Sequence, residues 1–192
     1  MKVRYPLLQK RAWHMQCAPP ERVILGIDPG VAIAGYAVLV ERQGQLTALA
    51  CDVIRTPART PLPDRLQLLH EQVSVLLTTY HPTEAAMESL FFGKNRTTAI
   101  AVAHARGVLM LALKQHDIPI EEFTPNQVKL AVTGDGHAKK DQVGEMVRIL
   151  LKLSAVPRPD DAADAAAVAI CHAHTSAWRS QISQLERKQE PR

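Results

Sequence analysis

Short apolar, β-branched runs alternate along the chain with segments of helical periodicity. Residues 22–28, RVILGID, form one such run and lead into Pro-Gly, which is typical of a buried strand closed by a turn. Gln43-Gly44 separates two longer runs and predicts a tight antiparallel connection. In chain order, the runs predict strands over residues 22–28, 33–41, 45–54, 84–89 and 118–123.

Apolar residues at helical spacing fill the segments between and after the later strands. The first predicted helix has Asp64 as its expected N-cap and stops at His81-Pro82. Thr97 or Thr98 is expected to cap a second helix that runs to about Gln115. Three more helices are predicted, over residues 125–133, 139–153 and 161–178.

This order of elements predicts an α/β protein. Three consecutive strands form an antiparallel meander, and two parallel strands are added through helical crossovers, which gives a five-stranded mixed sheet flanked by helices. The length of 192 residues suits one domain, expected over residues 22–178. We expect residues 1–21 to be a flexible basic extension and residues 179–192 to be a polar C-terminal tail.

The composition is that of an ordinary globular protein. Hydrophobic residues make up 46% and charged residues 22%, which excludes disordered, collagen-like and disulfide-scaffold classes. No uncharged apolar stretch approaches the roughly 18 residues of a membrane span. The three widely spaced cysteines are typical of free thiols in a reducing compartment. We therefore expect a cytoplasmic protein with no membrane partner.

The formal net charge of +4 lies in the N-terminal segment. Five of the first 22 residues are Lys or Arg and one is acidic. From Val23 to Thr175 the chain has 14 Lys and Arg against 16 Asp and Glu, so the body is slightly negative. A basic arm on such a body favours an anionic partner only weakly.

Two carboxylates stand at the ends of predicted strands. Asp28 follows the apolar run Val23 to Ile27, and Glu88 follows Ala85-Ala86-Met87. If these strands are parallel neighbours joined by a right-handed crossover, the two acids lie side by side and require a cation. The alternatives are a turn cap for Asp28 and a solvated strand end for Glu88.

Asp161 and Asp164 form the third acidic feature. They lie three residues apart at the start of an Ala-rich helix and therefore share one helix face. They could simply complement the helix dipole, but the alanines indicate close packing on the sheet, which would bring the acids into the site. With Asp28 and Glu88 they form an all-oxygen ligand set suited to two hard divalent ions, which would make the body positive toward a phosphodiester.

Seven segments resemble one family in its order: ILGIDPG (24–30), GYAV (35–38), MESLFFGKN (87–95), ARGVL (105–109), NQVK (126–129), AKKDQVGEMVRILLKL (138–153) and DAADAAAVAICHAH (161–174). The family is the RuvC-type Holliday-junction resolvases, crossover junction endodeoxyribonucleases of the ribonuclease H-like superfamily. The resemblance implies a five-stranded ribonuclease H-like fold and a homodimer. It also implies Mg²⁺- or Mn²⁺-dependent cutting of four-way DNA junctions in recombination and repair, in partnership with the RuvA–RuvB branch-migration complex.

The resemblance also implies roles for individual residues. Asp28, Glu88, Asp161 and Asp164 match the family's four catalytic, metal-binding acids. Asp160 could share a helix face with Asp164, but the DAAD match favours Asp161. In the implied chemistry, one metal ion activates water and a second stabilises the leaving 3′ oxygen, which yields a 5′ phosphate. The basic residues 1–21 have no counterpart in the family pattern.

The remaining candidates are DNA contacts. Lys129 and Lys140 match lysines that face the scissile phosphate, and Phe91 matches an aromatic residue that stacks on bases. Lys94 and Arg96 flank the Phe91 loop with positive charge, and Lys139 precedes Lys140 at a helix start, where a phosphate would bind. The alternatives are a sheet-edge plug for Phe91 and solvated lysines. His172 and His174 are interpreted as ordinary helix-surface residues.

Two other functions remain open from the sequence. One is a ribonuclease H-like nuclease acting on RNA·DNA hybrids or other branched substrates. The other is a non-catalytic module that binds junctions or, like actin, phosphate. The presence of all four acids argues against a silent module, and the absence of GxxxxGK[ST] argues against a nucleotide site.

Overall fold

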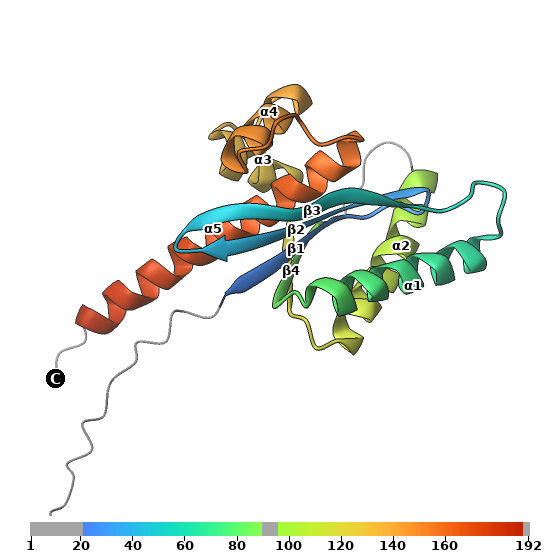
Figure 1. Ribbon diagram of the computed structural model, residues 1–192, viewed down its shortest axis with the longest axis horizontal. Coiled ribbons are helices and arrows are strands. Elements are labelled where there is room, and N and C mark those ends of the chain that lie inside the picture. The colour runs from blue at the N-terminus through green and yellow to red at the C-terminus, as the bar shows by residue number, and fades with distance from the viewer. Residues whose placement is uncertain (1–20, 90–95, 190–192) are drawn as a thin grey trace, which may run out of the picture.

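The computed structural model describes residues 21–89 and 96–189, with side chains described outside 96–98 and 180–189. Figure 1 shows a central sheet with helices on both faces. The strands are β1 (Arg22–Asp28), β2 (Ile33–Arg42), β3 (Gln45–Arg55), β4 (Glu84–Glu88) and β5 (Ile120–Phe123). Their order across the sheet is β3-β2-β1-β4-β5. The first two strand pairs are antiparallel, and β4 and β5 are added in parallel, which confirms the predicted topology.

The parallel register of β1 and β4 decides where the site lies. Ile27 pairs with Met87, so Asp28 and Glu88 follow at the carboxyl ends of adjacent strands. A buried turn holds the chain after Asp28: the Thr56 hydroxyl donates to the carbonyl of Val31 at 2.5 Å. The two acids therefore meet at one edge of the sheet, as the sequence predicted.

The helices are α1 (Leu62–Tyr80), α2 (Arg96–Gln115), α3 (Pro125–Thr133), α4 (Lys140–Leu150) and α5 (Asp160–Gln189). Several predicted boundaries were wrong: β5 begins at Ile120 instead of Ile118, and α4 ends at Leu150 instead of Leu153. The N-cap of α1 is Pro61, so Asp64 lies inside the first turn. Helix α2 begins at Arg96, so neither Thr97 nor Thr98 precedes it. Helix α5 runs to Gln189, well past the predicted end at Trp178.

The helices form two layers around the sheet. Helices α1 and α2 cover one face, where Leu25 and Ile27 meet Leu69 and Leu109. Helix α5 covers the other face, and α3 and α4 pack against it. No helix in the described part of the chain combines the length and the apolar character needed to cross a membrane.

Two glycines let α5 approach the sheet. A Cβ atom at Gly35 would lie 1.9 Å from the backbone oxygen of Asp161, and one at Gly26 would lie 2.2 Å from that of Ala165. Both distances are far below van der Waals contact, so only glycine fits at either position. Close packing of the first turns of α5 on β1 and β2 brings the acids of α5 to the sheet edge.

Candidate active site

The four predicted acids come from three elements: Asp28 from β1, Glu88 from β4, and Asp161 and Asp164 from α5. Burial is the largest cause that raises the pKa of Asp28, to about 7. The negative charges of Glu88, Asp164 and Asp161 raise it further, in that order. Burial and the charge of Asp164 likewise raise the pKa of Glu88. Burial together with neighbouring negative charge thus makes ionisation of Asp28 and Glu88 harder, which is typical of an acidic site that holds cations.

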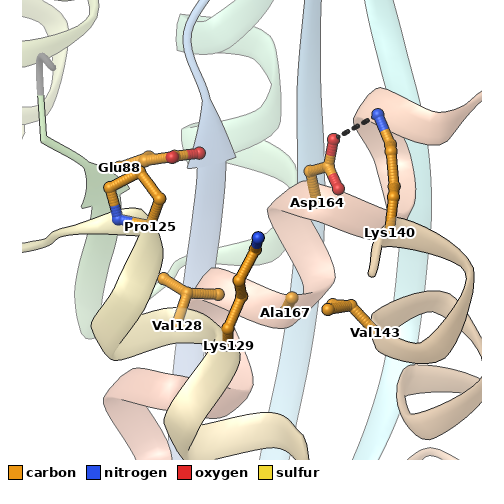
Figure 2. Close-up of a pocket in the computed structure, with 8 residues that line it drawn as sticks. All are labelled: Glu88, Pro125, Val128, Lys129, Lys140, Val143, Asp164 and Ala167. Carbon is orange, nitrogen blue, oxygen red and sulfur yellow. Dashed lines mark ion pairs between the residues drawn. The ribbon is translucent and has the colours of Figure 1, made fainter. Parts of the chain in front are cut away.

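The side chains of Glu88 and Asp164 line a cavity of about 240 Å³. Its walls come from β4, α3, α4 and α5, and Figure 2 shows the two carboxylates on opposite sides of it. The lining residues are Glu88, Pro125, Val128, Lys129, Lys140, Val143, Asp164 and Ala167. The cavity therefore combines acids with two lysines over an apolar floor.

The two lysines partly balance the acids. Lys140 Nζ lies 2.9 Å from Asp164 Oδ2 and 3.6 Å from Asp160 Oδ2. Lys129 projects toward the space between Glu88 and Asp164, and its charge lowers the pKa of Glu88 against the effect of burial. Helix α3 presents Lys129 at this position because a capping box between Thr124 and Gln127 starts the helix directly after β5.

The donors suit a hard divalent ion. Carboxylate oxygens are the ligands that Mg²⁺ and Mn²⁺ prefer, and burial, with neighbouring acids adding to it, raises the pKa values of Asp28, Glu88 and Asp164. Within residues 21–89 and 96–189, no three His, Cys, Asp or Glu side chains converge on a single point. Lys140 supplies a positive charge at Asp164, with Nζ 2.9 Å from Oδ2. The donor chemistry therefore fits a metal, and a metal on Asp164 would compete with Lys140.

Asp160 and Asp161 are adjacent in the sequence but have different surroundings. Asp160 forms ion pairs with Arg158 and Lys140, and its side chain is half exposed. Asp161 contributes to the raised pKa of Asp28, whereas Asp160 is not among the charges that do so. The geometry thus favours Asp161 over Asp160 as the partner of Asp28.

The DNA-contact predictions divide into two groups. Lys129 and Lys140 line the cavity, and Lys139 is exposed at the N-cap of α4. Phe91 and Lys94 lie outside the described residues, and Arg96 starts α2 without a described side chain.

The predicted exposure of one histidine was wrong, and one residue that contacts the site was not predicted from the sequence. His172 is buried, with Nε2 at 2.5 Å from Glu84 Oε2, so its interpretation as a helix-surface residue was wrong. His174 is exposed, as predicted. Arg106 is buried under the sheet and contacts Glu88. The only sequence signal was an arginine within a mostly apolar helix, in the segment ARGVL.

Comparisons with known proteins agree on one family. The family model "Crossover junction endodeoxyribonuclease RuvC" matches residues 24–172. A relative of that name from Heliobacterium modesticaldum is 50% identical over 156 residues, which are 81% of this chain and 96% of the relative. One from Thermomicrobium roseum is 48% identical and covers 85% of this chain and 98% of its own.

Solved structures show the same fold. The Thermus thermophilus RuvC structure in complex with a Holliday junction substrate has a TM-score of 0.77 at 35% identity, covering 81% of this chain and 94% of its own. The yeast mitochondrial Holliday junction resolvase shares the fold, with a TM-score of 0.64 at 14% identity, covering 87% of this chain and 86% of its own. The mixed sheet and its acid-lined edge define a nuclease of the ribonuclease H-like class. Within that class, the chain belongs to the RuvC family of crossover junction endodeoxyribonucleases, which are metal-dependent.

The raised carboxyl pKa values predict a pH-dependent stability of the metal-free protein. Protonated Asp28 stabilises the fold fully below its ordinary value of 3.8, and this contribution is lost as the pH rises through about 7. At about pH 8, in the presence of a chelator, Asp28→Asn is therefore expected to be more stable than the wild type by roughly 1–3 kcal/mol. The difference should shrink at about pH 5. Urea denaturation at both pH values measures it, and a variant that is less stable at the higher pH would contradict the prediction.

Proposed function

We propose that this protein resolves Holliday junctions by paired nicks and that Asp28, Glu88, Asp161 and Asp164 hold the divalent ions used in the reaction. The observation that carries the proposal is that Asp28 is buried among three other acids: burial first, and then the charges of Glu88, Asp164 and Asp161, raise its pKa to about 7. Such a cluster is costly to a fold unless a cation occupies it. We propose two ions, Mg²⁺ or Mn²⁺, for each site.

Metal ions bound here would supply an activated water and charge neutralisation at the leaving 3′ oxygen. The protein's own lysines hold the substrate. Lys129 and Lys140 line the cavity, where their ammonium groups can contact the scissile phosphate and orient it toward the acids. Lys140 would exchange its contact with Asp164 for the phosphate, since both offer an anionic oxygen at the same ammonium.

DNA contacts outside the cavity complete the proposal. Lys139 is exposed at the start of α4, next to Lys140, and can bind a flanking phosphate. Phe91 follows Glu88 by three residues, and Lys94 and Arg96 follow Phe91. We propose that Phe91 stacks on an unpaired base near the cut and that the two cations bind the backbone beside it. As a member of the family, the protein is proposed to act in the cytoplasm on junctions bound by the RuvA–RuvB complex.

A homodimer would present two such sites for the paired nicks. Helix α2 exposes Ile100 (59%) and Leu111 (54%), and a Cβ atom on Gly107 would meet nothing within 4 Å. An apolar face with room for close backbone approach fits a second copy of the chain.

The dimer proposal makes a testable prediction. Light scattering at micromolar concentration is expected to give the mass of two chains, and Leu111→Arg is expected to give one, because a charge would be buried in the interface. Val75→Arg is the matched control, since Val75 is an equally exposed apolar residue (57%) on α1. A monomeric wild type, or equal dissociation of both variants, would contradict the assignment of α2.

The function itself is tested by substrate choice. Purified protein is incubated with a four-way junction, a linear duplex and an RNA·DNA hybrid of equal length, each with Mg²⁺ or Mn²⁺. We expect paired nicks with 5′ phosphates in the junction alone. Preferential cutting of the hybrid would favour a ribonuclease H-like activity instead, and binding without cutting would favour a non-catalytic module.

A further inference from the structure

Arg106 is a buried charge that the proposed mechanism does not use. It lies on α2, and its side chain is only 8% exposed. Burying a guanidinium is costly unless its donors are satisfied, so its partners indicate what it does.

Among the described residues, the guanidinium of Arg106 has two partners, which lie on adjacent strands. Nη1 donates a hydrogen bond to the backbone carbonyl of Glu88, the last residue of β4. Nη2 lies 2.8 Å from Glu122 Oε2 on β5. The planar fork of arginine presents two parallel groups of N–H donors, so one guanidinium can bind both acceptors in a fixed geometry.

The backbone after Glu88 is held on its other side as well. The Ser89 N–H donates to the carbonyl of Phe123 at 2.8 Å, which continues the β4–β5 pairing past the end of the strand. The peptide group between Glu88 and Ser89 is therefore anchored at both its carbonyl and its N–H. Glu88 is the last residue of β4, so the contact with Arg106 anchors the carboxyl end of this strand.

We propose that Arg106 is a positioning residue: its bond to the Glu88 carbonyl keeps the Glu88 carboxylate in the cavity, facing the other acids. The proposal rests on the proposed role of Glu88 as a metal ligand. Outer partners that orient a ligand typically change metal affinity tenfold to hundredfold when they are removed. Arg106 contacts the backbone of Glu88, so the loss of its side chain should weaken metal binding and leave the affinity for DNA unchanged.

The test measures Mn²⁺ binding without DNA, by titrating the free-ion signal in electron paramagnetic resonance. Arg106→Gln is expected to weaken Mn²⁺ binding roughly tenfold to hundredfold. Arg106→Lys should recover part of this loss, because an ammonium keeps the positive charge and a donor but lacks the fixed geometry of the guanidinium. Glu122→Gln should have a smaller effect than Arg106→Gln, since the contact with Glu88 remains. Junction affinity should stay within about twofold of the wild type for all three.

Arg22→Gln is the matched control for the loss of a partly buried ion pair. Arg22 pairs with Glu84 at the opposite end of the same strand, with Nε at 2.7 Å from Oε1. Its loss should lower the melting temperature and leave Mn²⁺ affinity unchanged. Wild-type Mn²⁺ affinity in Arg106→Gln, or the same loss in Arg22→Gln, would overturn the positioning role.

Glu88→Gln separates the two proposals. If Glu88→Gln weakens Mn²⁺ binding and Arg106→Gln does not, the positioning role fails while the metal site stands. If Glu88→Gln itself binds Mn²⁺ normally, the assignment of Glu88 fails and the positioning role falls with it. If Arg106→Gln does not fold, Arg106→Lys and Glu122→Gln carry the test, and normal Mn²⁺ affinity in both overturns the proposal.

Discussion

Amide substitution of any one of the four clustered acids is expected to abolish junction cleavage. Each substitution removes one negatively charged ligand from the four acids proposed to hold the metal ions. Charge stabilisation by a bound metal is worth several kcal/mol in the transition state, so the rate should fall at least about 1000-fold. The four variants are Asp28→Asn, Glu88→Gln, Asp161→Asn and Asp164→Asn.

Junction binding should survive these substitutions. Affinity for DNA comes mainly from contacts between cations and phosphates, and the amides leave Lys129 and Lys140 in place. Gel-shift titration in chelator and single-turnover cleavage with Mg²⁺ separate binding from cutting. A variant that cuts at a rate near that of the wild type would remove that residue from the site.

Asp160→Asn is the matched control for Asp161→Asn. The two residues are adjacent at the start of α5, but Asp160 pairs with Arg158 at the surface, whereas Asp161 acts on Asp28. Asp160→Asn should lower the cleavage rate less than about tenfold, because its ion pairs with Arg158 and Lys140 are exposed, and an exposed ion pair is worth at most about 1 kcal/mol. If Asp160→Asn were inactive and Asp161→Asn active, the assignments would have to be exchanged.

Gly35→Ala is expected to lower cleavage at least about a hundredfold through the position of α5. The added Cβ atom would lie 1.9 Å from the Asp161 backbone oxygen, and backbone cannot rotate away as a flexible side chain can. The first turn of α5 must therefore shift outward and carry Asp161 away from Asp28, which pairs with Gly35 across the strands. Such overpacking should also destabilise the fold by about 1–3 kcal/mol.

Gly136→Ala controls for the exchange of glycine by alanine. A Cβ atom at Gly136 would lie at an ordinary 3.6 Å from the Asn126 backbone oxygen, so activity and stability should stay close to those of the wild type. Circular dichroism, thermal denaturation and single-turnover cleavage are measured on each preparation. A Gly35→Ala protein with wild-type stability and rate would show that α5 does not depend on this contact to place its acids.

The amino-acid sequence was sufficient to predict the sheet and the acids at its edge. Apolar runs ending in Asp28 and Glu88 are local patterns, and the crossover rule then places the two strands in parallel. The Ala-rich start of α5 likewise predicts close packing of this helix on the sheet. The helix ends were harder to predict: capping chemistry suggested Asp64 and Thr97 or Thr98, but α1 and α2 start earlier along the chain.

Only the tertiary structure decided which charges meet. Lys140 pairs with Asp164 of α5, Arg106 joins α2 to the ends of β4 and β5, and His172 is buried against Glu84 at the opposite end of the sheet. Each of these contacts joins residues far apart in the sequence, and none follows from a local period or a turn motif. Periodicity depends on neighbours along the chain and is therefore visible in the sequence. The partner of a charged side chain depends on which elements pack together, so it is settled only when the helices close over the sheet.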